Sequence, residues 1–170
     1  MNSNLKLVFY SIITTALCSL LLSCYSFKGT SINPNLRTFD VKLFSLSAPD
    51  APGNIHLDFT TRLREKIERE SRLIYNAKEP DIIFEGTLKR FSLNSEAPTG
   101  QRTSAIDRLT IEFEVRFTNT DDKQQNWKRN FSHFADMNAN ESFTERQDEL
   151  INTIYDQITE DIFNAAFSNW

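Results

Sequence analysis

Hydrophobic residues follow two different periods along this chain, and each period predicts a different kind of element. In residues 109–118 every second residue is apolar, the pattern of a β-strand with one buried face. In residues 55–70 apolar residues recur at every fourth position, and residues 142–170 carry a longer stripe of the same kind. Such a stripe indicates an amphipathic helix packed by one side. The chain is therefore expected to mix long strands with two helices.

Four further segments have strand character, with β-type residues between turns that contain Pro, Gly or Asn. They are residues 36–46, a short run at 71–76, residues 82–93 and residues 127–137. Gly86 marks a bulge or a close-packing point in its strand, and Ser142 with Glu145 matches a capping box at the start of the last helix. The order β-α-β-β-β-β-α predicts an α+β fold, a two-layer sandwich with two helices on one face of a mixed β-sheet.

The N-terminus has the pattern of a bacterial lipoprotein. Lys6 is its only charged residue, and the apolar run that follows is too short and wrongly flanked for a spanning helix. The run ends in Leu-Leu-Ser-Cys at residues 21–24, which fits a lipobox. We expect cleavage of residues 1–23, a diacylglycerol on Cys24 and an acyl chain such as palmitate on its amine, which together anchor a protein firmly. The alternative is an uncleaved anchor with an incidental cysteine.

Composition supports the same division of the chain. Removal of residues 1–23 from the 170 leaves 147 residues, enough for one domain, with residues 24–35 as a lipidated tether and 36–170 as the folded part. The two cysteines are Cys18, lost on cleavage, and Cys24, so no thiol is left for a disulfide, a metal or catalysis. The formal charge of −4 becomes −5 without Lys6, which argues against nucleic-acid binding.

The sequence offers little for catalysis. Its two histidines, His56 and His133, have no recognisable partner at motif spacing, and no metal, cofactor or nucleophile motif is found. We therefore predict no catalytic residue, no metal site and no cofactor, and hence no enzyme. Paired carboxylates of a glycan hydrolase are the alternative, against an ordinary solvated charged face. The carboxylates in question are Glu112, Glu114, Glu149, Asp156, Glu160 and Asp161.

One basic grouping stands out. Lys89 and Arg90 lie near the end of one predicted strand, Arg102 lies in the following loop, and Arg108 opens the next strand. If the two strands pair, these cations gather near one end of the sheet, where they would suit a phosphorylated glycolipid. The alternative is scattered solubilising charge. Lys89, Arg90 and Arg108 are the candidates for lipid binding, chosen on charge alone.

Several short strings resemble the lipopolysaccharide-assembly lipoprotein family, LptE-like, in its shorter form. They begin with CYSFKGTSI at residues 24–32 and continue in the same order and spacing to the C-terminus. The others are DIIFEG at 81–86, RLTI at 108–111, VRFTN at 115–119, FSHFAD at 131–136 and TEDIFNAA at 159–166. No single string is decisive, but together they span the mature chain.

This resemblance implies a non-enzymatic lipoprotein in the inner leaflet of the outer membrane, facing the periplasm. Such proteins plug an LptD-type β-barrel, help to assemble it and help to deliver lipopolysaccharide, which they bind. Tyr25, rather than Asp, directly after the lipidated cysteine gives no signal for inner-membrane retention. A periplasm-facing binding or structural lipoprotein with another envelope partner stays open as the alternative.

Overall fold

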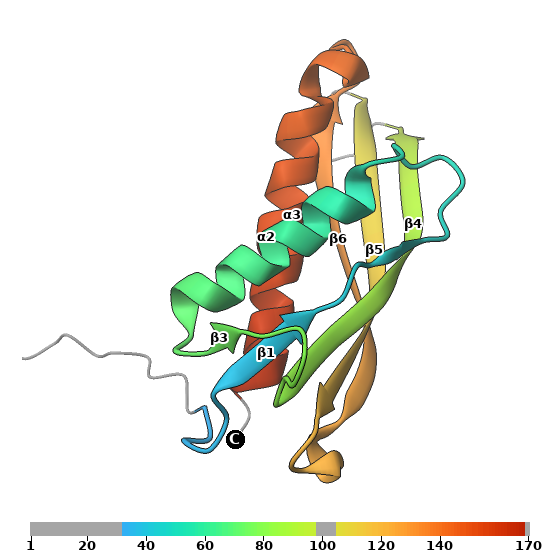
Figure 1. The fold of residues 1–170 in the computed structure, drawn as a ribbon. Helices are drawn as coiled ribbons and strands as arrows, with labels where there is room; N and C mark the ends of the chain where they lie inside the picture. Colours follow the sequence, from blue (N-terminus) through green and yellow to red (C-terminus); the bar gives the residue numbers. More distant parts are fainter. Residues whose placement is uncertain (1–31, 98–104, 169–170) are drawn as a thin grey trace, which may run out of the picture.

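Two helices lie on one face of a mixed β-sheet and leave the other face open (Figure 1). The computed structural model describes residues 32–97 and 105–168. The helices are α2 (Ile55–Glu70) and α3 (Phe143–Phe167), and a short 3-10 turn, η1, spans Lys123–Gln125. The strands are β1 (Thr38–Val41), β2 (Ser45–Leu46), β3 (Ile74–Tyr75), β4 (Ile82–Glu96), β5 (Ile106–Asn119) and β6 (Trp127–Asn138). The predicted two-layer α+β sandwich is confirmed.

The sheet has the strand order β3-β1-β4-β5-β6, and β2 pairs with β4 beside β1. Strand β5, which runs Ile106–Asn119, pairs antiparallel with β4 on one side and with β6 on the other. Strands β1, β2 and β3 are all joined by parallel pairing, β1 to β3 and to β4, and β2 to β4. The sheet is therefore mixed, with a long antiparallel meander and a short parallel part that α2 connects.

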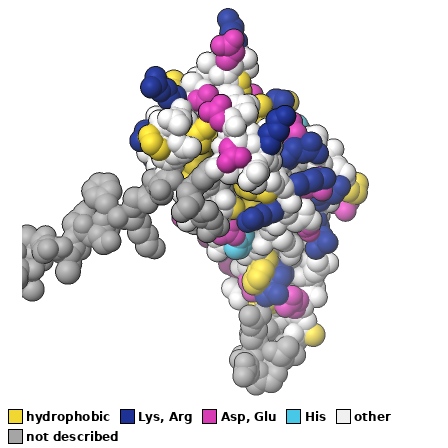
Figure 2. Space-filling view, turned by 90° about the horizontal axis from the view of Figure 1, so that it is seen from below, with side chains coloured by type: hydrophobic (Ala, Val, Ile, Leu, Met, Phe, Trp, Pro, Cys, Tyr) yellow, Lys and Arg dark blue, Asp and Glu magenta, His cyan; other side chains and the backbone are white. Residues whose placement is uncertain are grey.

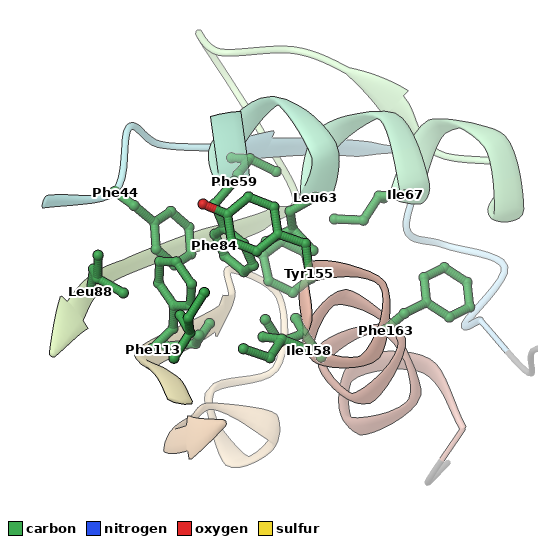
Figure 3. Close-up of a cluster of buried hydrophobic side chains, with 14 of the residues drawn as sticks. Phe44, Phe59, Leu63, Ile67, Phe84, Leu88, Phe113, Tyr155, Ile158 and Phe163 are labelled. Carbon is green, nitrogen blue, oxygen red and sulfur yellow. The ribbon is translucent and has the colours of Figure 1, made fainter. Parts of the chain in front are cut away.

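The core fills the space between the helices and the inner sheet face. The alternating residues of β5 are buried as predicted, and the stripe of α2 faces them. The Phe113 ring stacks on Phe59 with centroids 3.7 Å apart, and Phe44 and Tyr155 pack edge-on to Phe59, each at 5.1 Å (Figure 3). Burial of each such ring contributes roughly 1.5–3 kcal/mol, so this aromatic cluster is a main source of stability.

The prediction of one strand over residues 36–46 is wrong, because the segment forms two short strands, β1 and β2. Between them the Phe44 amide donates to the Thr60 hydroxyl of α2 at 3.1 Å, while the Phe44 ring enters the core. Thr60 is itself buried, and its hydroxyl donates to the His56 carbonyl at 2.7 Å. A helix side chain thus replaces the strand ladder at this point, and the chain bends.

Two local predictions need correction. Gly86 is a close-packing point, since an added Cβ would meet the Glu114 carbonyl and the Phe44 ring, but the bulge of β4 lies between Leu88 and Arg90. Ser142 does precede α3, yet its side chain makes no capping hydrogen bond, so the capping box with Glu145 is not formed. Backbone hydrogen bonds are made at this helix start instead, with the Glu145 amide donating to the Ser142 carbonyl at 3.1 Å.

Strand β4 continues to Glu96, three residues beyond the predicted strand, and β5 begins at Ile106, three residues earlier than predicted. The signal peptide, Cys24 and Arg102 lie outside the described residues. Within the part of the chain that is described, no helix is both long and apolar enough to cross a membrane.

Candidate functional site

The open sheet face, meaning the side of β4, β5 and β6 turned away from the helices, carries most of the chemistry that the sequence singled out. Side chains alternate along a strand, so the buried row of β5 leaves Glu112, Glu114 and Arg116 on this opposite face. Seen from the lower end of Figure 1, Lys and Arg side chains line one side of the molecule with acidic side chains among them (Figure 2). The surface is therefore mixed in sign rather than uniformly basic.

Strand register explains why the charges alternate. Glu85 of β4 lies opposite Arg116 of β5, and Arg116 lies opposite Lys128 of β6. The resulting ion pairs join Arg116 to Glu85 at 3.5 Å and Lys128 to Glu114 at 2.9 Å. Lys42, just after β1, adds a contact to Glu85 at 3.6 Å. These five side chains line a shallow hollow of about 310 Å³, which we call the basic hollow.

The sequence candidates lie on the same strands. Arg90 is exposed and contacts Glu112 at 3.4 Å. Lys89 is exposed at the β4 bulge, and its charge helps to lower the pKa of Glu114, after the larger effect of the Lys128 hydrogen bond. The two strands, β4 and β5, do pair, in antiparallel orientation. A binding role for these side chains stays a prediction.

Arg108 is held much more firmly. Its guanidinium donates to Asp136 at 2.7 and 2.9 Å, contacts Glu96 at 2.8 Å, and lies over the Phe134 ring at 3.9 Å from the ring centroid. Hydrogen bonding to Asp136 raises the pKa of Arg108. A phosphate that binds here must exchange with carboxylates that already neutralise the charge.

Sequence reasoning missed the basic hollow. Lys42, Arg116 and Lys128 are separated in the chain and meet through pairing of β1 with β4, of β4 with β5 and of β5 with β6. The register of the hairpin of β5 and β6 could have revealed this site, because a register that pairs Phe113 with Phe131 also pairs Arg116 with Lys128. The loop lengths alone did not supply that register.

The carboxylates of the hydrolase alternative each contact a basic side chain. On α3, Asp156 contacts Arg62 and Glu160 contacts Lys66, both at 2.6 Å, which ties α3 to α2. The remaining contacts join Asp161 to His133, Glu149 to Arg146, Glu112 to Arg90, and Glu114 to Lys128. Most of these contacts link neighbouring elements of the fold.

Lys66 shows how such a contact is stabilised. Its side chain is only 9% exposed, and it reaches Glu70 at 2.9 Å as well as Glu160. Burial lowers the pKa of Lys66, but hydrogen bonds to the two carboxylates outweigh burial and raise it. The ammonium therefore stays charged between the helices.

A groove of about 470 Å³ runs between α2 and α3, lined in part by Asp58, Asp148 and Tyr155. The Tyr155 hydroxyl donates to the Ile55 carbonyl at 2.5 Å, and burial raises the pKa of this phenol. The hydroxyl therefore serves packing of α3 against the start of α2. Within residues 32–97 and 105–168, no three metal-ligating side chains gather.

The start of the described chain is fixed to the domain. Ile32 and Leu36 are buried, and Arg72 donates to the Ile32 carbonyl at 2.8 Å. Part of the predicted 24–35 tether, from Ile32 on, thus packs on the folded domain.

Comparison with known proteins adds a family and a fold. The family described as lipopolysaccharide-assembly, LptE, matches residues 36–166. A comparison of the sequence with curated proteins finds no match. Among solved structures, the protein XCC0632 from Xanthomonas campestris aligns with 10% identity and a TM-score of 0.55, over 81% of this chain and 90% of that one.

Two further structures are similar. A putative neuraminyllactose-binding hemagglutinin homolog from Helicobacter pylori aligns with 10% identity and a TM-score of 0.51, over 82% of this chain and 88% of that one. A minor lipoprotein from Acinetobacter baumannii aligns with 15% identity and a TM-score of 0.43, over 74% of this chain and 92% of that one. At these identities, the first two likenesses show a shared fold.

Proposed function

Because the chain belongs to the lipopolysaccharide-assembly family LptE, we propose that it is an outer-membrane lipoprotein that plugs an LptD-type β-barrel and helps to deliver lipopolysaccharide to the cell surface. The observation that carries this proposal is the family match, which covers residues 36–166 of the 170. The strand and helix order of the domain, read from the sequence and found in the structure, supports it.

The lipid on Cys24 would hold the protein at the inner leaflet, with the domain facing the periplasm. The lipobox at residues 21–24 supports this anchor, as does the absence of a free thiol once residues 1–23 are removed. Because Arg72 binds the Ile32 carbonyl, only residues 25–31 would connect the lipid on Cys24 to the domain. The domain would therefore stay close to the membrane in which the barrel lies.

The open sheet face is the surface we assign to lipopolysaccharide and to the barrel wall. It combines basic side chains with carboxylates that can exchange partners, and Arg binds phosphate through two parallel hydrogen bonds. The contributing cations are Lys89, Arg90 and Arg108, together with Lys42, Arg116 and Lys128 of the basic hollow. Because the mature chain carries a formal charge of −5, binding has to come from these local contacts rather than from net charge.

Affinity purification of the tagged, lipidated protein from outer membranes in mild detergent tests the proposal. Recovery of a large heat-modifiable β-barrel in roughly equal amount, with lipopolysaccharide, is the expected result. Recovery of the protein alone, with normal lipopolysaccharide display after its depletion, would reject the plug and favour another envelope partner. Mass spectrometry of the N-terminal peptide separately tests the lipid on Cys24.

Charge reversal tests the assigned surface. Arg116→Glu and Lys128→Glu should lower the yield of lipopolysaccharide or barrel, since each removes a cation from the basic hollow. Lys78→Glu, an exposed cation in the turn before β4, changes the net charge equally and should leave the yield unchanged. Equal yields from all three variants would show that the open sheet face is not the contact surface.

A further inference from the structure

Strand β3 gives one end of the domain an exposed apolar edge. Ile74 is 69% exposed, the highest value among the large hydrophobic residues in the described part of the chain, and Tyr75 beside it is 38% exposed. Both lie on an edge strand that pairs only with β1 among the described strands. Burying an exposed Ile side chain is favourable by roughly 1.5–3 kcal/mol, so this edge gains from contact with an apolar phase.

The same edge lies beside the point where the chain leaves the domain toward its N-terminus. Arg72, two residues before Ile74, donates to the Ile32 carbonyl, and both segments lie at the lower left of Figure 1. Seven residues separate Ile32 from Cys24. Even a fully extended connection spans at most about 26–29 Å over these eight steps. A lipid on Cys24 therefore keeps the β3 edge within reach of the bilayer.

Basic side chains flank the exposed pair. Arg37 lies beside Ile74, whose amide donates to the Arg37 carbonyl at 2.9 Å, and both Arg37 and Arg72 are exposed. Asp81 accepts from the amides of Arg37 and Thr38 at 2.8 Å, so its carboxylate is engaged by the backbone. The exposed acids Glu68 and Glu79 partly offset the positive charge of this end.

We propose that Arg37, Arg72, Ile74 and Tyr75, which we call the β3 end, rest on the headgroup region of the membrane that holds the lipid of Cys24. Ile74 enters the acyl boundary, Tyr75 lies at headgroup level, where tyrosine is favoured, and the arginines contact anionic lipid. This inference rests on the lipid anchor of the proposed function. It adds an orientation, in which α2 has its C-terminal end toward the membrane and its N-terminal end away from it.

Thiol labelling can test this orientation on the full lipidated chain. Cleavage removes Cys18 and the lipid occupies Cys24, so Ile74→Cys provides a single thiol for an environment-sensitive fluorophore. The control is Leu57→Cys, since Leu57 is 44% exposed in the first turn of the 16-residue helix α2, about 20 Å along the helix from its other end. Each labelled protein is placed in vesicles of phosphatidylethanolamine and phosphatidylglycerol, and far-UV circular dichroism checks its fold.

The expected result is a blue-shifted emission at position 74 that a lipid-embedded nitroxide quenches, with the label at position 57 still quenched by aqueous iodide. Equal iodide quenching at both positions, with the protein still bound to vesicles, overturns the inference while leaving the anchor intact. A blue shift at position 74 that no lipid-embedded quencher reduces indicates contact with a second protein copy and also overturns it.

Failure of the proposed function is recognised separately. Absence of acyl mass on the peptide that begins at Cys24 rejects the anchor and with it this orientation. Absence of a co-purifying barrel rejects the plug, while a nitroxide-quenched label at position 74 still supports membrane contact of the β3 end.

Discussion

Gly86→Ala should destabilise the domain although it adds a single methyl group. An added Cβ would meet the Glu114 carbonyl of β5 and lie 2.5 Å from the Phe44 ring. Neither can move away easily, because the carbonyl belongs to a paired strand and the ring packs against Phe59 at 5.1 Å and Phe113 at 5.8 Å. Overpacking of this kind costs about 3 kcal/mol at the upper end of its usual range.

An opposing effect has to be subtracted. Alanine restricts the unfolded chain and favours a strand interior over glycine by roughly 0.5–1 kcal/mol. The net loss in the free energy of unfolding is then about 2 kcal/mol by the same overpacking estimate. For a domain of this size, that loss corresponds to a fall in Tm of about 6–10 °C.

Urea and thermal unfolding, followed by circular dichroism, measure this loss. Gly53→Ala is the matched control, since nothing lies within 4 Å of its added Cβ and its φ is not positive. The control should be as stable as the wild type or slightly more stable. If Gly86→Ala unfolds at the same urea concentration as Gly53→Ala, the close approach of Phe44 to the β4 backbone does not limit packing, and the reasoning is refuted.

Four other changes test the core and its polar contacts by the same unfolding assays. Phe113→Ala removes a fully buried ring stacked on Phe59 and should cost about 3–5 kcal/mol; a loss below 1 kcal/mol would contradict the stacked geometry. Tyr155→Phe loses the hydrogen bond to the Ile55 carbonyl and should lower the free energy of unfolding by about 1 kcal/mol. An unchanged free energy of unfolding would show that water satisfies this carbonyl equally well. The free energy of unfolding of Lys66→Met should stay within about 1 kcal/mol of wild type, because Glu70 and Glu160 can return to water while an apolar side chain fills the site. A large loss of stability would show that the ion pairs of Lys66 dominate. Hydrogen bonds from the amides of Arg37 and Thr38 lower the pKa of Asp81, so its contribution is present above the ordinary value of 3.8 and is lost as pH falls through the lowered pKa. Asp81→Asn should therefore be less stable than wild type at pH 7 and approach it below pH 3.8, whereas parallel stability curves from pH 7 to low pH would exclude this linkage.

The parts of the fold that could be predicted from sequence are those in which one face of one element decides the structure. The alternation of β5 and the four-residue spacing of α2 each report burial of a single side, and the structure has both elements where the pattern placed them. The break after β1 could not be read this way. It depends on a hydrogen bond between Phe44 and Thr60, which are close only once α2 lies on the sheet.

The candidate site was predictable only in part for the same reason. Charge alone drew attention to Arg90 and Arg108, but it could not show that Glu112 and Asp136 lie against them. Those partners come from neighbouring strands, and a register shift of one residue would turn the acids to the helix side. The prediction of a capping box at Ser142 is wrong, because this short motif makes the capping hydrogen bond favourable but does not require it to form.

The parallel pairing of β1 bears on how the chain acquires its structure. β1 lies between β3 and β4 in the sheet, and its partner residues in β4, Ile82 to Phe84, follow it by more than 40 residues. The meander β4-β5-β6 needs only neighbouring segments. In a chain that emerges N-terminus first, β1 can meet β3 early, but its pairing with β4 has to wait until β4 has followed. Closing so long a loop is slow. Docking of β1 onto a completed meander is therefore expected as a late step in folding.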